Sequence, residues 1–180
     1  MARYVVLVRG VNVGGHNKLP MAKFRELLSG LGFTEVVTYL QSGNAVITAP
    51  RQSPAKLATA VERALKQQLN LSVQVLVVTG ERFKRIVSDN PMVKDDQDPT
   101  HLYVAFLSGK PNSKALQAID VNRYAPDRFS VAGDVAYLHY PKGMGRSRLD
   151  PGVVFGRCGV WATARNWRTV GQLLDLVAED

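Results

Sequence analysis

The chain has 180 residues and a formal net charge of +8, and 46% of its residues are hydrophobic. This length allows one domain or two small ones, and the composition is ordinary for a globular protein. The longest apolar runs are far shorter than the roughly 20 residues that a transmembrane helix needs. The first residues, "MARYVVLVRG", lack the features of a signal peptide. We therefore expect a cytoplasmic protein with no membrane partner.

The positive charge is unevenly distributed along the chain. Residues 1–90 hold 12 basic and 5 acidic side chains, whereas residues 91–180 hold 11 and 10. Within the second half, the basic residues gather in 141–170. A basic surface attracts anions, so a nucleotide or a nucleic acid is a candidate partner. A basic composition kept for solubility is the alternative interpretation.

In the first half, short β-rich runs near 3–9, 34–40, 44–49 and 72–78 alternate with helical patterns. The first predicted helix places Met21, Phe24, Leu27, Leu28 and Leu31 on one face. The second begins after Ser53, a predicted N-cap, and carries apolar residues four positions apart from Leu57 to Leu69. The dipeptide Gly43-Asn44 predicts a tight turn between the middle two strands.

The second half predicts the same order after a connecting helix at 80–89 and a polar loop, "NPMVKDDQDPT". Strand "HLYVAFLSG" precedes a short helix, and two strands then meet at Gly133-Asp134. A helix near 149–158, the strand "WATAR" and a helix from about Asn166 complete the chain. This order predicts an α+β protein with two ferredoxin-like βαββαβ subdomains in tandem. The expected boundaries are 1–79, a linker at 80–100, and 101–180.

Four polar stretches interrupt this pattern: "RGVNVGGHNK", "YLQSGN", "PKGMGRSR" and "TARNWRT". Each combines a glycine or another small residue with Arg, Lys, Asn or Gln. Glycines let backbone N–H groups approach an oxyanion, and Arg and Lys bind phosphate through charge. Neither G-x-x-x-x-G-K-[ST] nor G-x-G-x-x-G is present in these stretches. A set of structural turns is therefore the alternative to a ligand site.

Signals for catalysis and for metals are weak. Only His16 and Ser42 are candidate catalytic residues, and neither belongs to a recognised catalytic motif. Asp95, Asp96 and Asp98 lack the spacing of a calcium loop, and the three histidines lack that of a zinc site. Cys158, the only cysteine, is expected to be a small packed residue. We expect no metal and no cofactor.

The sequence resembles the bacterial domain-of-unknown-function 1697 family over nearly its whole length. The resemblance lies in "RYVVLVRGVNVGGHNKLPM", "TYLQSGNAVI", "YLHYPKGMGRSRL" and "TARNWRTVGQLLDL". It implies two α+β subdomains similar to ferredoxin-like units, and it implies no established activity. The chain departs from the usual family pattern at Val11, Arg148, Ala164 and Arg168.

The residues that keep the family pattern are the expected ligand-binding residues: Arg9, Asn12, Gly14, Gly15, Asn17, Lys18, Gln41, Ser42, Gly43, Asn44, Gly145, Arg146, Ser147, Arg165, Asn166 and Trp167. Our leading hypothesis is that they bind a phosphate-bearing ligand, a nucleotide or a nucleic acid, at a basic, glycine-rich site between the subdomains. The cations would bind the phosphate of the ligand, and the glycines would present backbone N–H groups to it. The amide side chains would orient the remainder of the ligand. The alternatives are an enzyme acting on a small phosphorylated or acidic substrate, and a non-catalytic interaction module.

Overall fold

The chain folds into two compact units, which are described separately. The structure is a computed structural model that describes residues 1–179. Unit 1 comprises Met1–Val87 together with the C-terminal residues from Gly171, and unit 2 comprises Ser88–Val170. The protein has mixed α+β structure, with one four-stranded antiparallel sheet in each unit, which confirms the predicted α+β class.

The sheet of unit 1 has the strand order β2-β3-β1-β4. Its strands are β1 (Ala2–Val8), β2 (Thr34–Tyr39), β3 (Asn44–Ala49) and β4 (Val75–Thr79). β1 is central and pairs with β3 and β4 on its two sides, with Val5 opposite Val46 and Val78. The sheet therefore brings the end of β1 next to the turn that joins β2 and β3.

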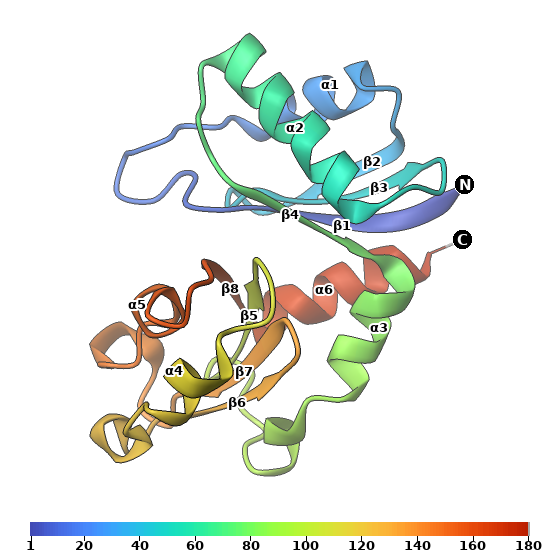
Figure 1. Ribbon diagram of the computed structural model, residues 1–180. Coiled ribbons are helices and arrows are strands. Elements are labelled where there is room, and N and C mark those ends of the chain that lie inside the picture. Colours follow the sequence, from blue (N-terminus) through green and yellow to red (C-terminus); the bar gives the residue numbers. More distant parts are fainter. Residues whose placement is uncertain (180) are drawn as a thin grey trace. The chain divides into compact units, whose positions relative to one another are not determined.

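Two helices cover one face of this sheet, as Figure 1 shows. They are α1 (Met21–Gly30) and α2 (Pro54–Leu69), and the apolar face predicted from their sequences is buried against the sheet. The Ser53 hydroxyl accepts a hydrogen bond from Lys56 N–H and caps α2, and Asn70 ends α2 in the left-handed conformation. After β4, α3 (Gly80–Ser88) follows directly.

The sheet of unit 2 has the equivalent order, β6-β7-β5-β8. Its strands are β5 (Leu102–Leu107), β6 (Arg128–Ala132), β7 (Val135–His139) and β8 (Ala162–Asn166). Gly133, with a φ of 65°, lies in the two-residue turn that joins β6 and β7, as the sequence predicts.

The helices of unit 2 are short. They are α4 (Ser113–Gln117) and α5 (Pro151–Gly156), with the 3₁₀ segments η1 (Pro91–Lys94), η2 (Val121–Tyr124) and η3 (Met144–Arg146). α6 (Trp167–Ala178) begins in unit 2 and ends in unit 1. Over residues 1–179, no helix is long and apolar enough to cross a membrane.

Candidate functional site

The expected site residues of unit 1 lie in a loop and a turn that hydrogen bonds hold together. The loop runs from Arg9 to Pro20, between β1 and α1, and the turn is Leu40–Gly43, between β2 and β3. The Asn12 amide group donates to Gln41 O at 2.5 Å and to Leu19 O at 2.9 Å, and its carbonyl oxygen accepts from Leu19 N–H at 2.8 Å. The structure thus brings together two stretches that are far apart in the sequence.

Most of the amides expected to orient a ligand hold the backbone of unit 1 instead. Asn17 Nδ2 donates to Gly10 O at 3.1 Å. Asn44 is fully buried, and its Nδ2 donates to Tyr39 O at 3.2 Å and to Ser42 Oγ at 2.8 Å. These side chains stabilise the loop and the turn, which is the role that the alternative interpretation assigns to them.

Gly43 is required by close packing. Its φ is 74°, and a Cβ atom there would lie 2.7 Å from Val11 Cγ2 and 2.8 Å from Val8 Cβ. No larger residue fits without movement of the loop. By contrast, Gly14 and Gly15 lie in the exposed part of the loop with His16 and Lys18, and a Cβ on Gly15 would meet no atom within 4 Å.

Arg9 and Arg165 are both engaged within their own units. Arg9 Nη1 donates to Gln74 Oε1 at 2.5 Å in unit 1. Arg165 lies in β8 of unit 2 and is only 9% exposed, and its Nη1 donates to Thr163 Oγ1 at 2.7 Å and to Ala164 O at 3.0 Å. Burial lowers the pKa of Arg165 to about 10. The Arg165 guanidinium is thus buried and hydrogen-bonded to its own strand.

At the start of α6, the expected residues have a capping role. Asn166 Oδ1 accepts a hydrogen bond from Thr169 N–H at 2.8 Å, which satisfies a donor in the first helical turn. Trp167, the first residue of the helix, is half-buried.

The remaining expected residues lie beside a cavity of about 330 Å³ that belongs to unit 2 alone. Two segments form it: a turn at 123–127 and the loop at 142–148. Its lining residues are Arg123, Tyr124, Ala125, Pro126, Asp127, Lys142, Gly143, Arg146, Ser147 and Arg148. We call this cavity the basic cavity. Gly145 is exposed on η3, which carries Arg146 at its end.

Hydrogen bonds fix the two segments of the basic cavity to each other. Ser147 Oγ donates to Asp127 Oδ2 at 2.5 Å and accepts from Leu149 N–H at 2.9 Å. Asp127 N–H donates to Tyr124 O at 2.9 Å, which closes the turn. The cavity is therefore preformed by the fold.

The basic cavity carries four cations against one carboxylate. Arg123, Lys142, Arg146 and Arg148 are exposed, and within residues 1–179 their side chains make no hydrogen bond and no ion pair. Like charges repel one another, so a group of unpaired cations around one hollow creates a positive potential that favours an anion.

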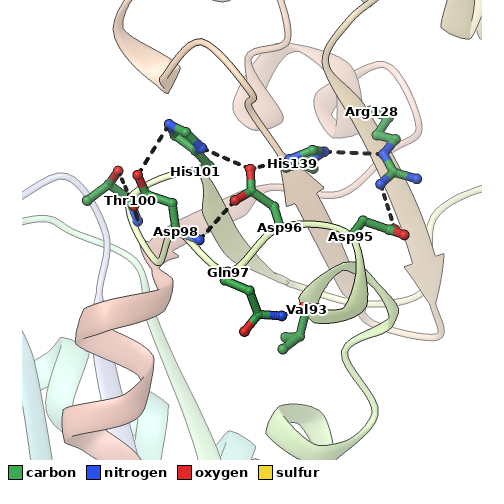
Figure 2. A network of polar contacts seen from close by, with 9 residues as sticks. All are labelled: Val93, Asp95, Asp96, Gln97, Asp98, Thr100, His101, Arg128 and His139. Atoms are coloured by element: carbon green, nitrogen blue, oxygen red, sulfur yellow. Dashed lines mark hydrogen bonds and ion pairs between the residues drawn. The ribbon is translucent and has the colours of Figure 1, made fainter.

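A second polar cluster in unit 2 lies around Asp96 (Figure 2). Asp96 Oδ2 contacts His101 Nδ1 at 2.8 Å and His139 Nε2 at 2.9 Å. Arg128 Nε lies 3.3 Å from His139 Nδ1, and Arg128 Nη2 contacts Asp95 Oδ2 at 2.6 Å. A guanidinium only donates, so His139 accepts at Nδ1 and carries on Nε2 the proton that it donates to Asp96.

These contacts hold the pKa of Asp96 well below its ordinary value. The hydrogen bond from His139 contributes most, followed by those from the Asp98 backbone and from His101. The cluster fixes the loop after η1 to β6, to β7 and to His101, which precedes β5. Within the described part of the chain, no group of His, Cys, Asp or Glu side chains is arranged to hold a metal ion.

Sequence reasoning did not identify Arg123, Asp127 and Lys142 as site residues. Asp127 and Arg123 lie in a short polar turn without a recognisable motif. This turn lies beside the loop at 142–148 only in the folded unit, so the sequence carries no signal for it. His101 and His139 both contact Asp96 Oδ2. Their neighbouring positions follow from the pairing of Leu102 with His139, which a prediction of strand register would have given.

The fold and the basic cavity define a two-unit α+β protein whose second unit carries a positively charged hollow. The chain is similar to the solved structure of the conserved bacterial protein SP0830 from Streptococcus pneumoniae, with a TM-score of 0.68 and 22% sequence identity over 98% of each chain. No curated protein matches the sequence. The model of the DUF1697 family, proteins of unknown function, matches residues 1–137, and the chain belongs to this family. The resemblance noted from the sequence is confirmed.

Proposed function

We propose that this protein binds a phosphate-bearing small ligand, such as a nucleotide, in the basic cavity of unit 2. The observation that supports the proposal is the group of four unpaired cations around one preformed hollow. Arg and Lys bind phosphate oxygens through charge-assisted hydrogen bonds. The proposed site contains two of the ligand-binding residues expected from the sequence, Arg146 and Ser147. It adds three cations that line the same cavity: Arg123, Lys142 and Arg148.

The size of the cavity favours a small ligand over a nucleic acid. A volume of about 330 Å³ is at the lower end of small-molecule sites. A nucleic acid would contact a longer basic stripe that follows its backbone. A nucleotide or a sugar phosphate belongs to this class of small ligands, and it would place its phosphate among the cations.

The proposal retains other predictions from the sequence. We propose that each unit is a ferredoxin-like βαββαβ subdomain, in agreement with its element order. A ligand role for the loop at 9–18 and for the turn at 41–44 stays a prediction. The existence of a single ligand site shared by both subdomains also stays a prediction. An enzyme that uses His16 or Ser42, a non-catalytic interaction module and a cytoplasmic location also stay predictions.

Calorimetric titration with AMP and with inorganic pyrophosphate tests the proposal. We expect binding that weakens as the salt concentration rises, because salt screens the cations. Arg146→Ala should reduce the affinity about 10-fold or more, as the loss of one charge-assisted hydrogen bond implies. Lys114→Ala is the matched control, because Lys114 is an exposed cation of unit 2 outside the cavity.

Two results would contradict the proposal. One is the absence of binding to both ligands at low salt. The other is an equal loss of affinity in Arg146→Ala and Lys114→Ala, which would indicate a diffuse effect of net charge without a defined site.

A further inference from the structure

The basic cavity contains a carboxylate that simple phosphate binding does not require. Asp127 lines the hollow together with Arg123, Lys142, Arg146 and Arg148. A negative charge in a phosphate site repels the ligand and weakens its binding. The presence of Asp127 therefore needs a reason beyond attraction of the anion.

The Asp127 carboxylate forms no ion pair with the cations around it within residues 1–179. Its Oδ2 accepts the hydrogen bond from Ser147 Oγ. Its charge acts on its surroundings, because Asp127 contributes, after burial, to raising the pKa of the neighbouring Tyr140 hydroxyl. The carboxylate is half-buried and fixed by the turn that Asp127 N–H closes.

The two carboxylate oxygens of Asp127 differ in their hydrogen bonding. Oδ1 has no hydrogen-bond partner in the described part of the chain, whereas Oδ2 is held by Ser147. An ionised carboxylate is an acceptor only, so the group that meets Oδ1 must be a donor. A hydroxyl of the ligand, close to its phosphate, meets this requirement.

We propose that the basic cavity selects a phosphate ester that carries hydroxyl groups, with Asp127 accepting a ligand hydroxyl while the cations bind the phosphate. This inference depends on the proposed function, because it names the ligand class of the same site. Asp127 would disfavour a bare phosphate by repulsion, and it would disfavour an ester without hydroxyls because its acceptor would be left unpaired. Sugar phosphates and ribonucleotides share the required chemistry.

The test compares ligands that differ only in their hydroxyls, with the full chain and by calorimetry. Glucose 6-phosphate is paired with oxan-2-ylmethyl phosphate, which keeps the ring oxygen, and AMP is paired with 2′,3′-dideoxyadenosine monophosphate. We expect the hydroxylated member of at least one pair to bind about 10-fold more tightly, as one hydrogen bond to a charged group implies. The pair that shows the larger ratio distinguishes a sugar phosphate from a nucleotide.

The variant Asp127→Asn separates selection from a structural role. Its amide oxygen can still accept from Ser147, but the negative charge is gone. Compared with the wild type, we expect this variant to bind the hydroxylated ligand more weakly and inorganic pyrophosphate more tightly. The two affinities should therefore change in opposite directions. A purely structural role predicts that both fall together. Asp134→Asn is the control for charge, because Asp134 is exposed in the β6–β7 turn and does not line the cavity.

Each outcome has a distinct meaning. Equal affinity within both pairs for the wild-type protein would overturn the hydroxyl inference and leave phosphate binding intact. The absence of binding to any phosphate compound would overturn the proposed function itself. If Asp127→Asn does not fold, the ligand pairs measured with the wild-type protein still decide the question.

Discussion

Unit 1 and unit 2 have the same strand order, but they use the polar residues of their loops in different ways. In unit 1, the connection between β3 and β4 contains the 16-residue helix α2, and in unit 2 the equivalent connection contains the 6-residue helix α5 and a long basic loop. The asparagines of unit 1 bond to its own backbone, whereas the four cations that line the basic cavity of unit 2 have no partners among residues 1–179. Similar polar sequences therefore hold the backbone in one unit and place unpaired cations around a cavity in the other.

The largest effect on stability is expected at Gly43. Gly43→Ala should destabilise the protein by about 3 kcal/mol, because it adds overpacking against Val8 and Val11 to the cost of a left-handed backbone. Urea denaturation measures the loss. Gly15→Ala is the control: its φ is 77° but its surroundings are open, so only about 1 kcal/mol is expected. Equal losses in the two variants would contradict the packing role of Gly43.

The next effect is expected at Asn12, which links the loop to the turn. Asn12→Ala removes three hydrogen bonds and leaves Leu19 N–H without its partner, so we expect a loss of about 2 kcal/mol in the free energy of unfolding. Asn17→Ala removes one side-chain hydrogen bond and should cost about 1 kcal/mol. If Asn12→Ala instead left stability unchanged and abolished ligand binding, the polar loop of unit 1 would have the role we assign to unit 2.

A smaller effect concerns the response of unit 2 to acid. The folded-state pKa of Asp96 is lowered, so its contribution to stability is present above its ordinary pKa of 3.8 and is lost as the pH falls below that value. We expect the difference in stability between the wild type and Asp96→Ala to shrink when unfolding is measured from pH 6 down to pH 3. A difference that is independent of pH would contradict the assigned role of the cluster.

How far the sequence predicts the structure depends on the range of the interactions. The apolar spacing of Phe24 and Leu28 predicted the buried face of α1, and Gly133 predicted the β6–β7 turn, because both depend on neighbours in the chain. The basic cavity was not predicted, since it depends on contact between the turn at Asp127 and the loop at Ser147. The family resemblance indicated Arg146 and Ser147, but it did not indicate which residues lie opposite them.

The smallest effect on stability is expected at the cations of the basic cavity. Arg146→Ala and Lys142→Ala should each change the free energy of unfolding by less than about 0.5 kcal/mol, because surface residues without partners contribute little. Urea denaturation, under the same conditions as for Gly43→Ala, measures this change in the free energy of unfolding. A loss of several kcal/mol would show that the loop at 142–148 depends on these side chains for its fold, and the contrast between the two units would disappear.

Phosphate binding in the basic cavity is tested by two crystal structures of the protein, one grown with saturating glucose 6-phosphate and one with saturating AMP. In at least one of them we expect a phosphate group within hydrogen-bonding distance of two or more of Arg123, Lys142, Arg146 and Arg148. The proposal is wrong if both ligands occupy other parts of the molecule, or if the basic cavity holds only water in both structures.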